Sequence, residues 1–230
     1  MNKNISIIIP IYNERESIFI LIDEISKVLK QHKFELIIVN DGSNDSFLNI
    51  FKTIEPKMKY LKCISHKYNQ GKSAAMLTGV RKASNDLICI LDGDGQNPPM
   101  EVINMLKIWE KQKQKEFLII CGNRLKRRDT LLKRYSSRFA NLIRKNILKD
   151  NCNDTACALK MFRKQDYLKI PYFQNVHRFL PALFNAFDGN VINTPVNDRP
   201  RKHGRSKFNF NNRFWIGIID LIKVWHLIKF

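Results

Sequence analysis

Short apolar runs alternate with longer amphipathic stretches through the first half of the chain. The runs are rich in Ile, Val and Leu and end at polar or glycine-containing turns, which is typical of β-strands. The stretches between them repeat apolar residues three and four positions apart, as one face of a helix does. This pattern predicts strands at residues 5–11, 34–40, 60–65, 86–91 and 117–121, and helices at residues 17–29, 72–83 and 99–112.

The alternation of strand and helix predicts an α/β fold, in which helices cover both faces of a mostly parallel, twisted sheet. A chain of 230 residues that is 44% hydrophobic is long enough to bury one sizeable core, which favours a single compact domain. In such sheets, ligands bind in the loops at the carboxyl ends of the strands. We therefore expect functional residues in the loops that follow the predicted strands.

Polar residues and glycine fill those loops. They read PIYNE at residues 10–14, VNDGSND at 39–45, HKYNQGK at 66–72 and DGDGQ at 92–96. One such loop would be ordinary turn chemistry, because Asp-Gly sequences are common in turns. Four of them at successive strand ends indicate a shared site.

The DGDGQ loop carries oxygen ligands on alternate residues, at Asp92, Asp94 and Gln96. Mg²⁺ and related hard cations take oxygen ligands, usually one or two carboxylates together with substrate phosphates and water. A calcium-binding EF-hand is disfavoured, because the twelfth position counted from Asp92 is Ile103, where that loop has Glu. The loop predicts a Mg²⁺ or Mn²⁺ site at Asp94 and Gln96. Asp92 is then a further ligand or the partner of a ribose or sugar hydroxyl.

The net charge of +19 lies almost wholly in the second half of the chain. Residues 1–123 hold 17 Lys/Arg against 14 Asp/Glu, whereas residues 124–230 hold 23 against 7. Such a basic half favours an anionic partner, which could be nucleic acid, phospholipid head groups or a phosphorylated substrate. A nucleic-acid-binding protein would not need acidic loops at four strand ends, since carboxylates repel phosphates unless a metal ion intervenes. We therefore expect no nucleic-acid partner.

The ordered set of motifs resembles the family 2 glycosyltransferases of the GT-A fold. The first four motifs are SIIIPIYNE at residues 6–14, IIVNDGSND at 37–45, NQGKSAAMLTG at 69–79 and ILDGDGQNPP at 90–99. Later ones are GNR at 122–124, DTACALK at 154–160, HRFLP at 177–181 and RPRKHGRSK at 199–207. The chain is most similar to the subgroup that resembles dolichol-phosphate mannosyltransferase, whose members load a sugar from a nucleotide onto a polyprenyl phosphate.

The resemblance implies a metal-dependent transfer from a GDP- or UDP-sugar to a polyprenyl phosphate, with inversion at the anomeric carbon. A phosphate acceptor is already anionic at neutral pH, so such a displacement needs no general base. The implied catalytic residues are Asp92, Asp94, Arg124 and Arg138. The implied donor-binding residues are Pro10, Tyr12, Glu14, Val39, Asp41, Asp92, Gly93, Asp94, Arg201 and Lys207.

Several positions leave the interpretation open or depart from the subgroup. Lys72 is either phosphate-facing or merely solvated. Ala156 and Ala158 stand where the subgroup usually has glycine, and Asp198 stands where it commonly has histidine before the RPR sequence. These departures concern the acceptor side more than the reaction class.

Two basic or apolar stretches suggest a membrane surface. Residues 124–149 hold ten Lys/Arg and one acid at mostly helical apolar spacing, as an interfacial helix does. Residues 214–230 are interrupted by Asp, Lys and His and number only 17, against the roughly 20 apolar residues that a span needs. Their stripe predicts an interfacial or docking helix; it comprises Phe214, Ile218, Leu221, Trp225 and Ile228.

We therefore expect a GT-A domain at residues 1–208, with a C-terminal amphipathic helix of the same domain at 209–230. Five cysteines without a CxxC pair favour buried thiols. The protein is expected to be cytoplasmic and peripheral on the inner face of the cell membrane. A family 2 enzyme with another cell-envelope glycan or lipid acceptor stays open, as do the sugar, the base and the oligomeric state. A sugar nucleotidyltransferase is disfavoured, because it would open with a glycine-rich loop where this chain has IYNE.

Overall fold

The computed structural model describes residues 4–125, 144–145, 147–201 and 210–229. Residues outside these ranges include two predicted site residues, Arg138 and Lys207, and most of the basic stretch at 124–149. The first residue of that stretch, Arg124, ends a strand.

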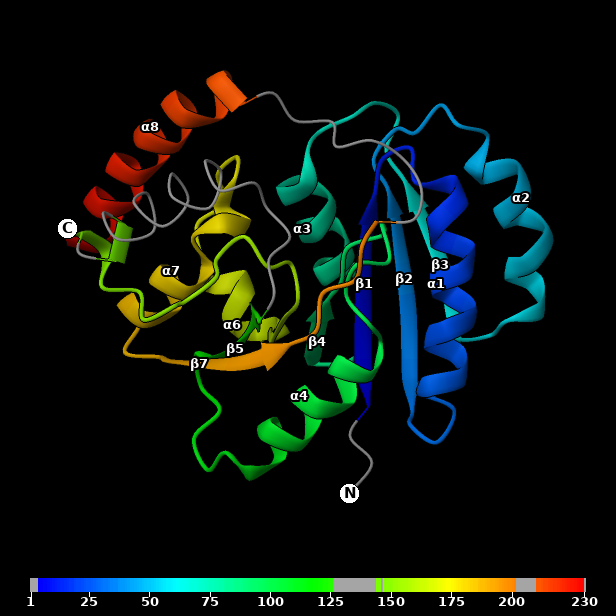
Figure 1. The fold of residues 1–230 in the computed structure, drawn as a ribbon, viewed down its shortest axis with the longest axis horizontal. Coiled ribbons are helices and arrows are strands. Elements are labelled where there is room, and N and C mark those ends of the chain that lie inside the picture. Colours follow the sequence, from blue (N-terminus) through cyan, green and yellow to red (C-terminus); the bar gives the residue numbers. More distant parts are fainter. Residues whose placement is uncertain (1–3, 126–143, 146, 202–209, 230) are drawn as a thin grey trace.

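The elements, shown in Figure 1, are β1 (Ile5–Ile11), α1 (Arg15–Val28), β2 (Phe34–Asn40), α2 (Phe47–Ile54), β3 (Leu61–Ser65), α3 (Lys72–Lys82), β4 (Leu87–Ile90), α4 (Met100–Lys111), β5 (Leu118–Arg124), β6 (Lys160–Arg163), α6 (Lys164–Lys169), α7 (Leu180–Ala186), β7 (Asn190–Val196) and α8 (Phe210–Lys229), with 3₁₀ turns at Glu55–Lys57 and Val176–Arg178.

The strands form one seven-stranded sheet in the order β3-β2-β1-β4-β6-β5-β7. β1 pairs in parallel with β2 and β4, β2 with β3, and β5 with β7. Only β6, among the described strands, runs antiparallel, between β4 and β5. The predicted mostly parallel α/β sheet is therefore confirmed, and the ends of β1 to β4 lie along one edge.

Alternate residues of the central strands face two different cores. Ile7 and Ile9 of β1 pack with α1, α2 and α4, whereas Ile8 between them packs with α3, α6 and α7. Helices thus cover both faces, as the sequence predicts. α3 lies unusually close to the sheet at Gly79, because a Cβ there would be 2.4 Å from Cγ2 of Ile8. A side chain at this position would push α3, which begins at the edge formed by the ends of β1 to β4, away from the sheet.

The C-terminal helix α8 packs against α7 and lies at the opposite end of the molecule from α2 (Figure 1). Val224 is fully buried, and Leu221 and Ile228 pack against the same core. Trp225 of the predicted stripe is exposed instead, since its direction on the helix differs from that of Val224. The outer face carries exposed Ile219, Ile222, Lys223, His226 and Lys229. No helix within the described ranges is both long and apolar enough to cross a membrane.

The thiols follow the sequence prediction at most positions. Cys89, Cys121, Cys152 and Cys157 are buried, and none of the cysteines forms a disulfide among the described residues. Cys63 is only half-buried. The thiols therefore serve the core, as small apolar side chains do.

Candidate active site

The first two loops at the sheet edge are joined into one unit by hydrogen bonds from backbone N–H groups to side-chain oxygens. Asn13, in a left-handed conformation with φ of 53°, donates its backbone N–H to Ser43 Oγ at 2.9 Å. Its own Oδ1 accepts the N–H of Asn44 at 2.8 Å. Asp45 accepts the N–H of Arg15 at 2.9 Å and that of Phe47 at 3.2 Å, so it ties the start of α1 to the start of α2. The side chains of Asn13, Ser43 and Asp45 therefore serve to build the edge.

Asp41 is the centre of a second set of contacts. Its Oδ1 lies 2.7 Å from His66 Nδ1 and accepts the N–H of Gln70, while its Oδ2 accepts the N–H of Gly71 at 2.8 Å. The carboxylate is buried and holds the loop that leads into α3. The neighbouring Gly42 has φ of +73°, and a Cβ there would lie 2.5 Å from the backbone of Tyr68. Asp41 thus anchors the loop at residues 66–71 beneath the site.

The DGDGQ loop presents its two carboxylates to two cations of the chain. Lys72 Nζ, at the start of α3, is hydrogen-bonded to Asp92 Oδ1. Arg201 Nη2 donates to Asp94 Oδ2 at 2.8 Å, and Glu14 Oε1 lies 3.5 Å from the same nitrogen. Asp94 Oδ1 accepts the N–H of Gln96 at 3.0 Å. The site therefore combines three acidic side chains, Glu14, Asp92 and Asp94, with two basic ones, Lys72 and Arg201. They come from four separate segments of the chain.

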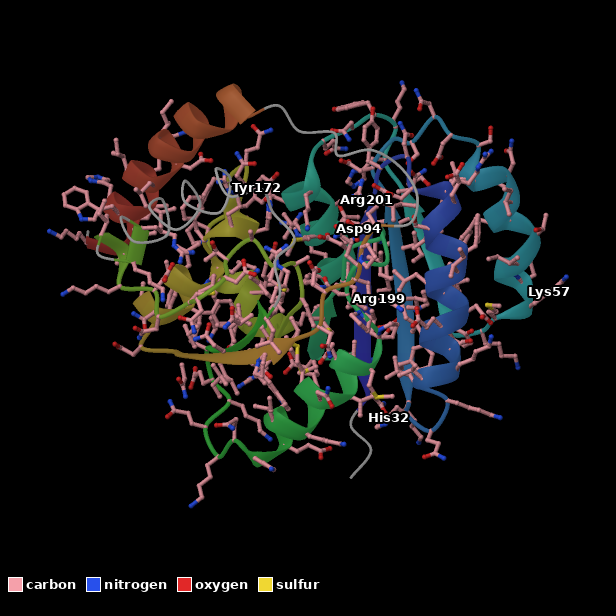
Figure 2. All side chains as sticks on the ribbon, in the orientation of Figure 1. His32, Lys57, Asp94, Tyr172, Arg199 and Arg201 are labelled. Carbon is pink, nitrogen blue, oxygen red and sulfur yellow. The ribbon has the colours of Figure 1, made fainter. Side chains whose placement is uncertain are left out.

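Residues 197–201, here called the strap, lie across this loop. The strap is fixed at one end by Asn197, whose N–H and Nδ2 both donate to Glu101 of α4. In its middle, Arg199 makes a two-pronged ion pair with Glu24 of α1 at 2.8 and 2.9 Å. Figure 2 shows Asp94 and Arg201 next to each other toward the carboxyl end of β1, with Arg199 farther along the same side of the sheet.

The strap also orients the amide of Gln96. Arg199 N–H donates to the carbonyl of Gln96 at 2.8 Å, and Gln96 Nε2 donates to the carbonyl of Arg199 at 3.2 Å. Because the amide nitrogen is used in this way, Oε1 is the atom left to bind a ligand, and it accepts no hydrogen bond from the described residues.

The charges at the site act on Arg201 in opposite senses. Partial burial alone would lower the pKa of Arg201, but the hydrogen bond from its guanidinium to Asp94 and the charges of Asp94, Glu14 and Asp92 together raise this pKa. Arg201 thus stays positively charged beside the acids. Its guanidinium geometry suits phosphate oxygens as well as carboxylates.

The oxygen donors fit a magnesium-type ion that shares its coordination with a substrate. Within the described residues, no three His, Cys, Asp or Glu side chains stand close enough to form an all-protein metal cage. Mg²⁺ seldom needs one, because it usually keeps water and phosphate ligands beside one or two carboxylates. Asp92, Asp94 and Gln96 Oε1 supply such a partial set. The chemistry of the donor set therefore agrees with the predicted cation.

Arg124, at the end of β5, is locked by Asp154. Its Nε and Nη2 donate to the two carboxylate oxygens of Asp154 at 2.7 and 3.0 Å. Burial alone would lower the pKa of Arg124, yet the hydrogen bonds and charge of Asp154 raise it above its ordinary value. Arg124 is consequently a fixed positive charge and not a mobile one.

The structure brings the predicted residues of the first half together and adds partners that the sequence did not indicate. Pro10 and Val39 lie near the ends of β1 and β2, and Tyr12 is exposed at the edge. The positions of Arg138 and Lys207 lie outside the described residues. The residues missed by sequence reasoning are Glu24, His66, Glu101, and Lys72 as the partner of Asp92. Each belongs to a different element, so only folding brings them to the site.

Comparison with known proteins identifies the family to which the chain belongs. The family model described as glycosyl transferase family 2 matches residues 6–170. The chain is 30% identical to a dodecaprenyl-phosphate galacturonate synthase of Rhizobium johnstonii, over 98% of this chain and 68% of the relative. It is 29% identical to an undecaprenyl-phosphate 4-deoxy-4-formamido-L-arabinose transferase of Yersinia enterocolitica, over 90% of this chain and 63% of the relative. The chain thus spans about two thirds of the length of these relatives.

Solved structures share the fold at low sequence identity. Glucosyl-3-phosphoglycerate synthase from Mycobacterium tuberculosis, in a complex with Mg²⁺ and UDP, matches with a TM-score of 0.72 and 14% identity over 98% of this chain and 79% of that chain. Mannosyl-3-phosphoglycerate synthase from Rubrobacter xylanophilus matches with a TM-score of 0.72 and 11% identity, over 96% and 73%. At this identity the likeness establishes the fold alone.

Proposed function

Because the chain belongs to glycosyl transferase family 2, we propose that it transfers a glycosyl group from a GDP- or UDP-sugar to a polyprenyl phosphate. The observation that carries the proposal is the pair of carboxylates at Asp92 and Asp94, set beside Arg201 at the edge of a GT-A sheet. The names of the two relatives, which specify transfer involving polyprenyl phosphates, support this acceptor class.

The donor binds at the edge formed by β1, β2 and β4. Asp92, Asp94 and Gln96 Oε1 would hold a Mg²⁺ or Mn²⁺ ion, which supplies positive charge to the leaving diphosphate. In this proposal exposed Tyr12 stacks on the base and Glu14 is an acceptor near it, whereas buried Asp41 shapes the pocket near the base, because both of its oxygens already accept N–H groups of the chain. Arg201 and Lys207 are assigned to the diphosphate. The remaining donor contacts are assigned to Pro10, Val39 and Gly93.

The acceptor phosphate is assigned to Arg124 and Arg138. Arg124 suits this task because Asp154 fixes its direction while its Nη1 side remains outside that two-pronged pair. Asp154 is a poor general base for the same reason, since both of its oxygens accept hydrogen bonds from a guanidinium. A phosphate monoester, with a second pKa near about 6, arrives already ionised and needs no base. Direct displacement with inversion follows from that chemistry.

In this proposal the protein acts at the cytoplasmic face of the cell membrane, where its acceptor would lie. In this proposal residues 1–208 carry the donor and acceptor sites, and the C-terminal amphipathic segment at 209–230, which includes α8 (Phe210–Lys229), belongs to the same domain. The basic second half and the outer face of α8, with Ile219 and Ile222 beside Lys223, suit an anionic lipid surface. Attachment is peripheral in this proposal.

The acceptor assignment predicts that the phosphate group is essential. UDP- and GDP-sugars should yield a lipid-linked sugar with polyprenyl phosphate and Mn²⁺, and no comparable product with the matching free polyprenol. Labelled donor and chromatography of the lipid fraction measure this directly. Equal rates with the alcohol would contradict the mechanism, and product on a different lipid or glycan alone would favour the broader family 2 alternative.

The same assay tests the metal site. Asp94→Asn should lower turnover about 100-fold or more, because a bound cation contributes several kcal/mol of charge stabilisation. Asp188→Asn is the matched control, since Asp188 is exposed and Asn tolerates its positive φ of 54°. Full activity of the Asp94 variant, or of the unaltered protein in excess chelator, would exclude the proposed metal site.

A further inference from the structure

Each carboxylate of the DGDGQ loop is already paired with a cation of this chain. Arg201 pairs with Asp94 and lies in the strap. Lys72 pairs with Asp92 from the first residue of α3. The side chains of Lys72 and Asp92 are 30% and 33% exposed, so this second pair is accessible to solvent at the edge where the donor is proposed to bind.

The two cations differ in how readily they can change partners. Arg201 contacts two acids, Asp94 and Glu14, and is held within the strap next to Arg199. Lys72 has one acidic partner among the described residues, and its ammonium is carried on a flexible four-carbon stem with rotatable donors. Its backbone position is secure, because Asp41 holds the preceding Gly71. Lys72 can therefore redirect its charge without moving the helix.

We propose that Lys72 is a positioning residue that exchanges partners. It neutralises Asp92 while the donor is absent, and it turns to the donor's diphosphate when a divalent cation takes its place on Asp92. The exchange follows from charge: an ammonium and a divalent cation repel each other on one carboxylate, whereas a diphosphate attracts the displaced ammonium. This inference rests on the proposed function, because it requires a metal-bound nucleotide donor.

The consequence is a coupling between metal and nucleotide. A metal ion that binds alone must displace Lys72 and leave its charge without a partner. A nucleotide diphosphate that binds with the metal supplies that partner. Each should therefore raise the affinity for the other by the same factor, as thermodynamic linkage demands. Lys72 is the residue that transmits this effect over a few ångströms.

The test measures Mn²⁺ binding directly, by the electron paramagnetic resonance signal of unbound Mn²⁺, with and without UDP or GDP. In the unaltered protein the nucleotide should tighten Mn²⁺ binding, within the roughly 5- to 150-fold range typical of couplings between sites. Lys72→Met, which keeps most of the unbranched stem and removes the charge, should bind Mn²⁺ alone about 5-fold tighter or more and lose most of the coupling. Lys72→Arg should retain the coupling.

Lys82→Met is the matched control, because it removes the same charge from the exposed far end of the same helix. It should leave both affinities unchanged, and thermal melting of each variant checks that the fold is intact. Unchanged or weaker binding of Mn²⁺ alone by a folded Lys72→Met variant would overturn the inference while leaving the proposed function standing. If the unaltered protein binds no Mn²⁺ with either nucleotide, the proposed function fails and the inference fails with it.

Discussion

Glu35, at the edge of the sheet opposite the active site, is a buried carboxylate with a purely structural environment. Its oxygens accept hydrogen bonds from Ser6 Oγ at 2.6 Å, Lys62 Nζ at 3.0 Å and Ser84 Oγ at 3.1 Å. Burial alone would raise the pKa of Glu35, but these hydrogen bonds and the charge of Lys62 outweigh it and lower the pKa. The group therefore joins β1, β2, β3 and the turn before β4 as an ionised acceptor.

Replacement of Glu35 should cost stability in a pH-dependent manner. A lowered pKa in the folded state stabilises the fold above the unfolded value of about 4.3, and this contribution disappears as pH falls through the folded value. Glu35→Gln should lower the free energy of unfolding by about 1.5–3 kcal/mol at pH 7, because it removes charged hydrogen bonds. Urea denaturation between pH 7 and pH 3 measures the difference, which should shrink below about pH 4.

The exposed Glu110 on α4 provides the control for that experiment. Glu110→Gln should change stability little at any pH, because an exposed carboxylate gains little from folding. A pH-independent difference between the Glu35→Gln variant and the unaltered protein would show that the carboxylate charge is not what Glu35 contributes.

At the residue scale, the sequence indicates which residues belong to the site better than it indicates which side chains they contact. The alternation of Asp92, Asp94 and Gln96 after a buried strand is enough to indicate a site, because strand ends converge in a parallel sheet. Lys72 could not be assigned in this way, since a lysine at a helix start reads equally as a solvated charge. Its pairing with Asp92 depends on how closely α3 approaches the sheet, which local sequence does not determine.

At the scale of elements, the strap behaves as a second layer behind the metal site. Its ion pair between Arg199 and Glu24 contacts no proposed substrate atom, yet the backbone of Arg199 orients Gln96 from both sides. Groups that orient a metal ligand in this way typically change metal affinity about 10- to 100-fold when they are altered. The strap therefore links α1 to the donor site.

Loss of this ion pair should weaken metal binding without unfolding the protein. Arg199→Lys and Glu24→Gln should each lower the affinity for Mn²⁺ in the presence of nucleotide by about 10-fold, and the double variant should lose little more than either single one. Calorimetric titration measures these affinities. Lys27→Gln, which breaks the exposed ion pair with Asp23 on the same helix, should have no such effect. Unaltered Mn²⁺ affinity in the Arg199 variant would contradict the role given to the strap.

The elements that the sequence predicts poorly are short or depend on distant packing. β1 and β2 coincide with the predicted runs at 5–11 and 34–40, because both are mostly apolar segments bounded by polar turns. β6 spans only Lys160–Arg163 and includes a buried lysine, whose ammonium donates to the carbonyls of Thr155 and Cys157. From the sequence alone, a lysine argues against a buried central strand, because the carbonyl groups that accept its hydrogen bonds are known only from the structure. β7 likewise contains asparagines and Pro195, which hide its strand pattern.

At the scale of the whole molecule, positive charge and exposed apolar surface coincide on the second half of the chain. Val224 of α8 is buried in the core, and Asp220 of α8 accepts a hydrogen bond from Asn175 Nδ2 at 3.0 Å. These two contacts fix the direction of the outer face of the helix. That face presents Ile219 and Ile222 beside basic residues. A bilayer surface with anionic lipids suits this combination, because apolar side chains enter the interface while lysines contact head groups.

Vesicle binding should therefore depend on the outer face of α8. Ile222, which is 60% exposed, can be replaced without disturbing the core, and Ile222→Glu should weaken binding to phosphatidylglycerol vesicles by about tenfold or more. The loss combines the apolar area no longer buried with repulsion between the new carboxylate and the lipid. Co-sedimentation with vesicles measures it, and added salt should weaken binding by the unaltered protein because the attraction is partly electrostatic.

The control substitution lies at the other end of the molecule. Ile50 on α2 is 41% exposed, and Figure 1 places α2 opposite α8, so Ile50→Glu makes the same chemical change on a surface that should not face the lipid. Its vesicle affinity should stay close to that of the unaltered protein. Equal losses in the two variants would mean that net charge alone governs binding, and unimpaired binding by the Ile222 variant would exclude α8 as the membrane-facing element.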